Sequence, residues 1–184
     1  MLIKPDITLA DEIRAYRKAF LERGDSMDGT GSLRWREDPA DWIADNVQCS
    51  QRETAPEGFV PATQFVCLNA QRKIVGMIQV RHELNDYLAK YGGHIGYSVH
   101  PDERRMGYAS WMLHEALAYC REIGLERVLV TCNADNTGSR KTIIKNGGVY
   151  ESACREPGED TDTERYWISL TSYKEKKSWI SDMR

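Results

Sequence analysis

The feature that most constrains the fold of this chain is a strand, a helix and a second strand that follow one another near its centre. Residues 94–101, HIGYSVHP, have the alternation and the closing proline of a β-strand. Residues 106–123 repeat apolar side chains at helical spacing, and Gly124 supplies a stop signal. RVLVTC, residues 127–132, is a short apolar run typical of a strand covered on both faces. Because such units cross over right-handed, the segment predicts a parallel strand pair.

Further helices and strands are expected on both sides of this unit. One helix is expected to begin at Thr8, and a second covers residues 37–47, with Asp38 as its cap and Pro39 in its first turn. NTGSRKTIIKNGG reads as a helix closed by glycines. Alternation predicts four more strands, at residues 63–70, 73–84, 148–156 and 164–170. The order of elements predicts an α/β (α+β) fold, with a mixed, mostly antiparallel sheet of about six to seven strands and helices on both faces.

Composition excludes several classes of protein. The chain has 184 residues and a net charge of -3, and its length predicts one domain at roughly 150 residues per domain. The acidic balance argues against a nucleic-acid partner, because such proteins usually carry a basic excess. No apolar run approaches the roughly 18 residues of a membrane span, and the N-terminus, MLIKPDITLADE, lacks the apolar core of a signal peptide. We therefore expect no membrane partner and a cytoplasmic location.

The cysteines point to reduced thiols rather than to a metal site or a redox motif. Their number is odd, none forms a C-x-x-C pair, and the histidines do not join them at ligand spacing. We therefore expect no metal, and mostly buried thiols in a reducing compartment.

The junction between the central strand and its helix has the residues of an anion site. A helix that begins near Arg105 or Met106 leaves several backbone N–H groups without intrahelical partners, and the helix dipole favours a negative charge there. Gly107 lets a ligand approach the backbone closely, because it has no Cβ. Arg104 adds a guanidinium for charge-assisted bonds to a phosphate. The alternative is that the two arginines form a solvated helix cap without a ligand.

This junction also carries a family resemblance. RRMGYA, residues 104–109, resembles the R/Q-x-x-G-x-G/A signature of the GNAT superfamily of acetyl-CoA-dependent N-acetyltransferases. IGYSVHP is similar to the central strand of that family, and NADNTGSRKTIIKNGG is similar to its N-x-x-S helix. The resemblance covers about residues 65–170, in the same element order. A group of uncharacterised predicted acetyltransferases shares RHELN and GGHIGY with this chain.

The resemblance implies a set of cofactor-binding residues and a central parallel pair of strands that splay apart. The CoA pyrophosphate would lie on backbone N–H groups of the junction, with the Arg104 side chain alongside, and these groups belong to Arg105, Met106, Gly107, Tyr108 and Ala109. The backbones of Ser98 and Val99 would pair with the pantetheine arm like an added strand. Asn136 would hydrogen-bond the cofactor and Ser139 would lie nearby, whereas helix capping is the alternative role for both.

The catalytic groups are less clearly marked. The resemblance puts Ile143 where many family members have a tyrosine that protonates the leaving thiolate, so another tyrosine is needed, and Tyr97, Tyr150 and Tyr166 are available. His94 is the first candidate for the base, because its ordinary pKa suits neutral pH, and Glu83 and His82 come next. A histidine or glutamate at a strand end is also a common surface or structural residue. Cys132 and Cys154 lack neighbours that would activate a thiolate, which favours direct transfer over an acyl-enzyme.

The expected activity is that of an acyltransferase which moves an acetyl group from acetyl-CoA to a primary amine of a small molecule or peptide. Residues 1–172 would form the acetyltransferase domain, with the acceptor-site region in 1–62, the cofactor-binding core in 63–172 and a charged tail in 173–184. A homodimer would follow the habit of such folds to pair their C-terminal strands across subunits. The competing functions are a non-catalytic acyl-CoA-binding or sensor domain and an unrelated phosphate-binding α/β domain.

Overall fold

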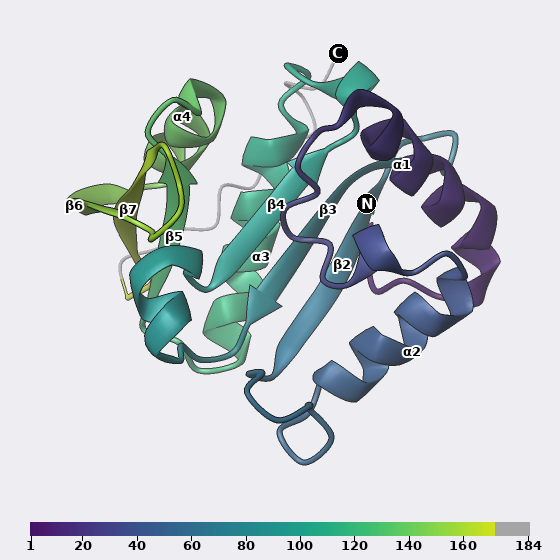
Figure 1. Cartoon of the computed structure of the whole chain (residues 1–184), viewed down its shortest axis with the longest axis horizontal. Helices are drawn as coiled ribbons and strands as arrows, with labels where there is room; N and C mark the ends of the chain where they lie inside the picture. The colour runs from purple at the N-terminus through teal and green to yellow at the C-terminus, as the bar shows by residue number, and fades with distance from the viewer. Residues whose placement is uncertain (172–184) are drawn as a thin grey trace.

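One seven-stranded sheet runs through the computed structural model, which describes residues 1–171 (Figure 1). The strand order across the sheet is β1-β2-β3-β4-β5-β7-β6. The strands are β1 (Leu2–Ile3), β2 (Ala62–Leu68), β3 (Ile74–Arg81), β4 (Ile95–Val99), β5 (Arg127–Asn133), β6 (Val149–Arg155) and β7 (Asp162–Ser169). All neighbouring pairs are antiparallel except β4 and β5. The predicted mixed sheet with its central parallel pair is therefore confirmed.

Helices cover both faces of the sheet (Figure 1). The longer helices are α1 (Ala10–Arg23), α2 (Pro39–Cys49), α3 (Tyr108–Glu122) and α4 (Thr137–Lys145). Shorter helical turns are η1 (Ile7–Leu9), η2 (Leu33–Trp35), the π-helical η3 (Leu88–Gly92) and η4 (Pro101–Glu103). Apolar residues of α1 and α2 form one buried cluster with β2 and β3, and those of α3 and α4 form a second cluster on the opposite face.

The helix termini show which local signals act. The Asp38 carboxylate accepts the N–H of Ala40 at 2.9 Å, and Pro39 opens α2, as predicted. The start of the first helix was misplaced. Asp6 caps the turn η1 by accepting the N–H of Thr8, and α1 begins only at Ala10. Thr8 therefore lies inside a preceding turn, because Asp6 offers that turn a charged acceptor two residues earlier.

The charged tail expected at residues 173–184 lies outside the described residues. Among residues 1–171, no helix is both long enough and apolar enough to cross a bilayer.

Candidate functional site

The parallel strands β4 and β5 meet at one end and separate toward the other. Their only paired position is Ile95 with Val130, although β4 continues to Val99 and β5 to Asn133. β5 pairs with β7 along its whole length on its other edge, and Figure 1 shows it diverging from β4. The result is a V-shaped gap between two strands, which we call the splay.

Backbone groups of β4 point into the splay. The N–H of Arg81 bonds to the carbonyl of His94, and the N–H of His100 bonds to the carbonyl of Val75. Antiparallel pairing alternates, so even-numbered residues of β4 face β3, whereas Tyr97 and Val99 turn their N–H and C=O groups toward β5. The Ser98 backbone, expected with Val99 to receive the pantetheine arm, is thus directed at β3. Its hydroxyl accepts a hydrogen bond from the Tyr16 phenol at 3.1 Å.

The junction between η4 and α3 lies at the open end of the splay. Arg105 and Gly107 both have left-handed backbones, with φ of 70° and 87°. Gly107 is the N-cap of α3 and gives it no side-chain cap, so the first N–H groups of the helix stay without an intrahelical partner. A Cβ at Gly107 would meet nothing within 4 Å, so the surface there is open. This geometry fits a bound anion.

The Arg104 side chain has protein partners beside this junction, and its Nε donates to the Val99 carbonyl at 3.4 Å. Its guanidinium forms an ion pair with Asp25 at 2.7 Å and lies over the Phe20 ring at 5.8 Å from its centroid. A second ion pair, Arg23 with Asp102, joins the same two segments. Arg104 therefore ties the anion-binding junction to the end of α1, because a nearby carboxylate binds its guanidinium.

On the other side of the splay, the start of α4 combines capping with a contact across the gap. Asn136 caps α4 by accepting the N–H of Ser139 at 3.0 Å. The Ser139 hydroxyl lies 2.7 Å from the phenol oxygen of Tyr97, which reaches over from β4. Burial raises the pKa of Tyr97, so its phenol is protonated at neutral pH. Ile143, in the position of the usual family tyrosine, is fully buried in the core.

His94 lies at the closed end of the splay. Its Nδ1 accepts the N–H of Leu129 at 2.9 Å, so that nitrogen carries no proton in this arrangement. The residue is 6% exposed, and burial lowers its pKa to about 4. Its ring packs edge-on against Trp167. A histidine with so low a pKa is a weak acceptor for a proton from an ammonium group.

The other catalytic candidates lie elsewhere and have partners of their own. Glu83 follows the end of β3, away from the anion-binding junction, and forms an ion pair with Arg52. Tyr150 is on the edge strand β6, separated from β5 by β7, and is 55% exposed. The Tyr166 phenol donates to Glu164 at 2.8 Å, and His82 Nε2 lies 2.9 Å from the Thr63 hydroxyl.

The loop after α1 reaches β4 at the point where the splay begins. Gly29, in the loop after α1, packs on the Gly96–Tyr97 peptide so closely that a Cβ there would lie 2.0 Å from the Gly96 oxygen. Asp28 precedes it, and the Arg81 guanidinium reaches the same point from the end of β3. The sequence signal was the pair of glycines in MDGTGS, which marks a close backbone approach without naming its target.

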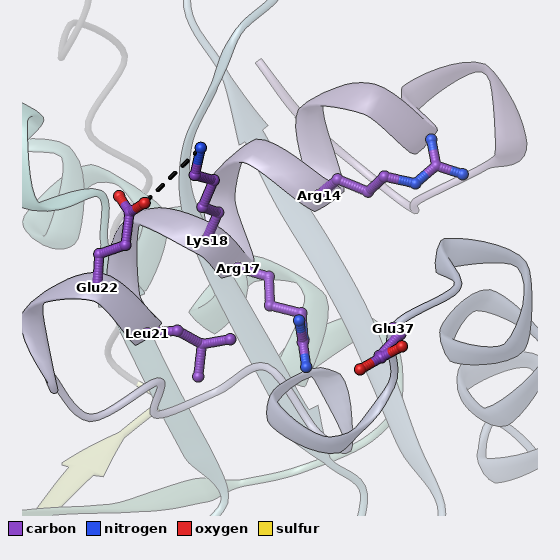
Figure 2. A pocket seen from close by; sticks show the side chains of 6 residues that line it. All are labelled: Arg14, Arg17, Lys18, Leu21, Glu22 and Glu37. Carbon is purple, nitrogen blue, oxygen red and sulfur yellow. Dashed lines mark ion pairs between the residues drawn. The ribbon is translucent and has the colours of Figure 1, made fainter.

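A separate hollow lies on the outer face of α1 (Figure 2). It has a volume of about 390 Å³ and is lined by Arg14, Arg17, Lys18, Leu21, Glu22 and Glu37. The inner face of the same helix packs on the sheet through Tyr16, so the hollow is separated from β4 by the width of a helix. Its lining carries charges of both signs, as on a solvated helix face.

Comparisons with known proteins agree with this geometry. A family profile described as Acetyltransferase (GNAT) family matches residues 28–147, whereas no curated protein matches the sequence. RimJ of Mycobacterium smegmatis, solved in complex with CoA-disulfide, superposes with a TM-score of 0.67 at 20% identity and covers 91% of this chain and 80% of its own. Spermidine N-acetyltransferase from Vibrio cholerae, solved with CoA and spermine, gives 0.61 at 16% identity over 93% and 95%.

Proposed function

The chain belongs to the GNAT acetyltransferase family and is an acyltransferase, and we propose that it moves an acetyl group from acetyl-CoA to a primary amine of a small molecule or peptide. The observation that carries this proposal is the splay between β4 and β5, which opens onto the uncapped start of α3. The five reduced cysteines suit a reducing compartment such as the cytoplasm.

Acetyl-CoA would bind along the splay from the start of α3 inward. The pyrophosphate would accept hydrogen bonds from backbone N–H groups between Arg105 and Ala109, because the left-handed residues of that segment turn the chain there. The amides of the pantetheine arm would pair with Val99 and Tyr97, whose backbone groups face the splay. Asn136 and Ser139 would border the arm from the side of α4.

The thioester would then lie where the strands begin to separate, near Gly96 and Tyr97. An amine with a pKa of about 10.4 is almost entirely charged at pH 7 and must lose a proton before it attacks. The N–H of Tyr97, which faces the splay, would stabilise the oxyanion of the tetrahedral intermediate. When the C–S bond breaks, the Tyr97 phenol is our candidate to donate its proton to the thiolate.

The remaining catalytic candidates are assigned by their surroundings. We propose that His94 orients the closed end of the splay through its bond to Leu129 and is not the main base. Glu83 is paired with Arg52, and Tyr150 lies on the edge strand, so we give both a lower rank than Tyr97. A non-catalytic acyl-CoA sensor is the alternative function, favoured by the buried Ile143 at the usual tyrosine position.

Calorimetric titration with acetyl-CoA tests the cofactor site directly. We expect Gly107→Glu to abolish binding, because it adds bulk and negative charge where the pyrophosphate would lie. Gly124→Glu is a matched control at the other end of α3, since Gly124 has the same φ of 87° and equally open surroundings. It carries the same backbone strain and should bind normally.

The outcomes separate the two functions. Unchanged affinity in folded Gly107→Glu would refute the placement of the cofactor. Tight binding by the wild type without release of CoA thiol in the presence of any amine would leave the sensor as the function.

A further inference from the structure

We propose that Asp28 and Arg81 together select the acceptor, with Asp28 holding its ammonium group and Arg81 binding an oxygen one or two atoms away. The chemistry that fits both is an α-amine beside a carbonyl or carboxylate, as in a free α-amino acid or the N-terminus of a peptide. This inference rests on the proposed acetyl transfer and names the class of amine that the same site would take.

Gly96 is the point at which the Arg81 guanidinium comes close to the backbone of Gly29, the residue that follows Asp28. A Cβ on Gly96 would lie 3.1 Å from the backbone nitrogen of Gly29 and 3.5 Å from Nη2 of Arg81. Gly96 directly follows Ile95, the last residue of β4 that pairs with β5. The loop that carries Asp28 and the Arg81 guanidinium therefore converge beside the place where the thioester would lie, and the glycine at position 96 allows the backbone of Gly29 to approach β4 this closely.

Arg81 is a half-buried cation whose hydrogen-bonding capacity is incompletely used. Its Nη1 donates to the carbonyls of Gly92 and Gly93 at 2.8 Å and 3.1 Å, which fixes the guanidinium in place. Burial lowers its pKa, and the charge of Asp28 only partly restores it. Within residues 1–171, no carboxylate lies within ion-pair distance of this guanidinium, and Nη2 has no hydrogen-bond partner. An oxygen of the acceptor would supply the missing partner.

Asp28 is the carboxylate placed to hold the amine. It directly precedes Gly29, which packs on the Gly96–Tyr97 peptide, and its charge raises the pKa of Arg81 against the larger effect of burial. Its hydrogen bond in the described structure is with the Ser26 hydroxyl, at 2.8 Å. Two other carboxylates already form ion pairs, since Asp25 binds Arg104 and Glu83 binds Arg52. Asp28 thus remains available to bind an ammonium group, orient it toward the thioester and accept its proton.

The same arrangement disfavours a polyamine. A long diamine that placed one ammonium group at Asp28 would find a fixed guanidinium close to its charges, and like charges repel. A carboxylate or carbonyl next to the amine turns this repulsion into a charge-assisted hydrogen bond. The site would therefore favour amines that have a carboxylate or carbonyl next to the reacting nitrogen over amines that carry a second cation.

Matched amines test the inference in the wild-type protein. Thiol release from acetyl-CoA would be measured with triplets built on one side chain, for example phenylalanine, a dipeptide that begins with phenylalanine, and phenethylamine, together with spermidine. We expect the first two types to exceed phenethylamine and spermidine by about 10- to 100-fold in kcat/KM. A higher kcat/KM with phenylalanine would indicate that the acceptor is a free amino acid, and a higher value with the dipeptide would indicate a peptide N-terminus.

Two substitutions test the roles of the two residues separately. Arg81→Gln should lower kcat/KM about 10- to 100-fold for amines beside a carbonyl and leave phenethylamine unchanged. Asp28→Asn, at an exposed position, should raise KM and lower kcat for every amine, because Asp28 is proposed both to hold the ammonium group and to accept its proton. Arg14→Gln and Glu22→Gln remove the same charges from the outer face of α1 and should change neither value. Acetyl-CoA affinity serves as the check that each variant is folded.

Each result has one meaning. Phenethylamine or spermidine turned over as well as the α-amines would overturn the inference and leave the acetyltransferase standing, and this holds even if Arg81→Gln fails to fold. Acetyl-CoA binding without turnover of any amine would overturn the proposed function, and this inference with it.

Discussion

Tyr97 connects the two sides of the splay at the level of a single residue. Its backbone faces β5, while its phenol reaches the Ser139 hydroxyl at the start of α4. Burial raises its pKa, which keeps the phenol protonated at neutral pH, so that it has a proton to donate in a hydrogen bond to the leaving thiolate. The phenol therefore lies beside the first turn of the helix from which the usual family tyrosine is missing.

Tyr97→Phe is expected to lower kcat by about 10²- to 10⁴-fold, because the thiolate would leave without its acid. The acetyl-CoA affinity should change little, since the backbone of residue 97 is kept. Steady-state thiol release together with calorimetry separates the two effects. If Tyr150→Phe lowered kcat by this much and Tyr97→Phe did not, the acid would be Tyr150 on the edge strand β6.

Residue types were easier to predict from the sequence than the directions of side chains. Gly107 could be placed at the start of a helix because its neighbours set a strand end and a helical period. The direction of the Arg104 side chain could not be predicted, since it depends on Asp25, which lies 79 positions away in the sequence. Tyr97 could not be ranked above Tyr150 for the same reason, because its partner Ser139 comes from another element.

At the scale of elements, the loop after α1 determines the shape of the acceptor side. Its Gly29 packs on β4, and its neighbour Gly31 lies against the amides of Gln64 and Gln79. The Gln64 side-chain nitrogen donates to the Gly29 carbonyl at 2.9 Å. Gln64, Gln79 and Gly96 occupy one row across three neighbouring strands. The loop is thus held by a row of the sheet, with Asp28 at its tip.

Gly29→Ala should displace this loop, because the new Cβ would lie 2.0 Å from a backbone oxygen and the residue has a φ of 71°. We expect amine turnover to fall at least about tenfold and stability to fall by about 1–3 kcal/mol, while acetyl-CoA still binds. Gly24→Ala is the matched control, with a φ of 68° and nothing within 4 Å of the added carbon. Similar amine kinetics in the two variants would mean that the contact with β4 does not shape the acceptor side.

Elements were predicted well where a period or a cap was strong. The central strand, the helix after it and the strand 127–132 appear within two residues of the expected bounds. The two-residue strand β1 was missed, because Leu2–Ile3 is too short to show alternation and forms only by pairing with β2. The π-helical turn η3 is held by contacts from distant strands, including Arg165 to the Lys90 carbonyl and Thr131 to the Tyr91 carbonyl. No local pattern encodes such contacts.

At the scale of the whole molecule, the closed end of the splay contributes to stability as well as to shape. His94 joins β4 to β5 in both directions, since its N–H donates to the Leu129 carbonyl at 2.7 Å and its ring accepts the Leu129 N–H. Trp167 of β7 covers the ring. The junction of the two halves of the sheet therefore depends on an imidazole that must remain neutral.

The pH dependence of unfolding should reveal this imidazole. Burial lowers the pKa of His94 to about 4, whereas an unfolded chain would give about 6.5. Between these values the unfolded state binds a proton that the folded state does not, so this contribution is complete above pH 6.5 and is lost as the pH falls toward 4. The loss should be on the order of 2–3 kcal/mol.

Urea unfolding of the wild type and of His94→Asn at several pH values between 7.5 and 4 measures the effect, because asparagine keeps an acceptor near Nδ1 and does not titrate. We expect the difference in unfolding free energy between the two proteins to shrink steadily below pH 6.5. Burial also lowers the pKa of His82, but that residue is present in both proteins and cancels in the difference. A difference that stays constant down to pH 4 would mean that His94 is protonated in the folded protein and that the two strands are joined by other contacts.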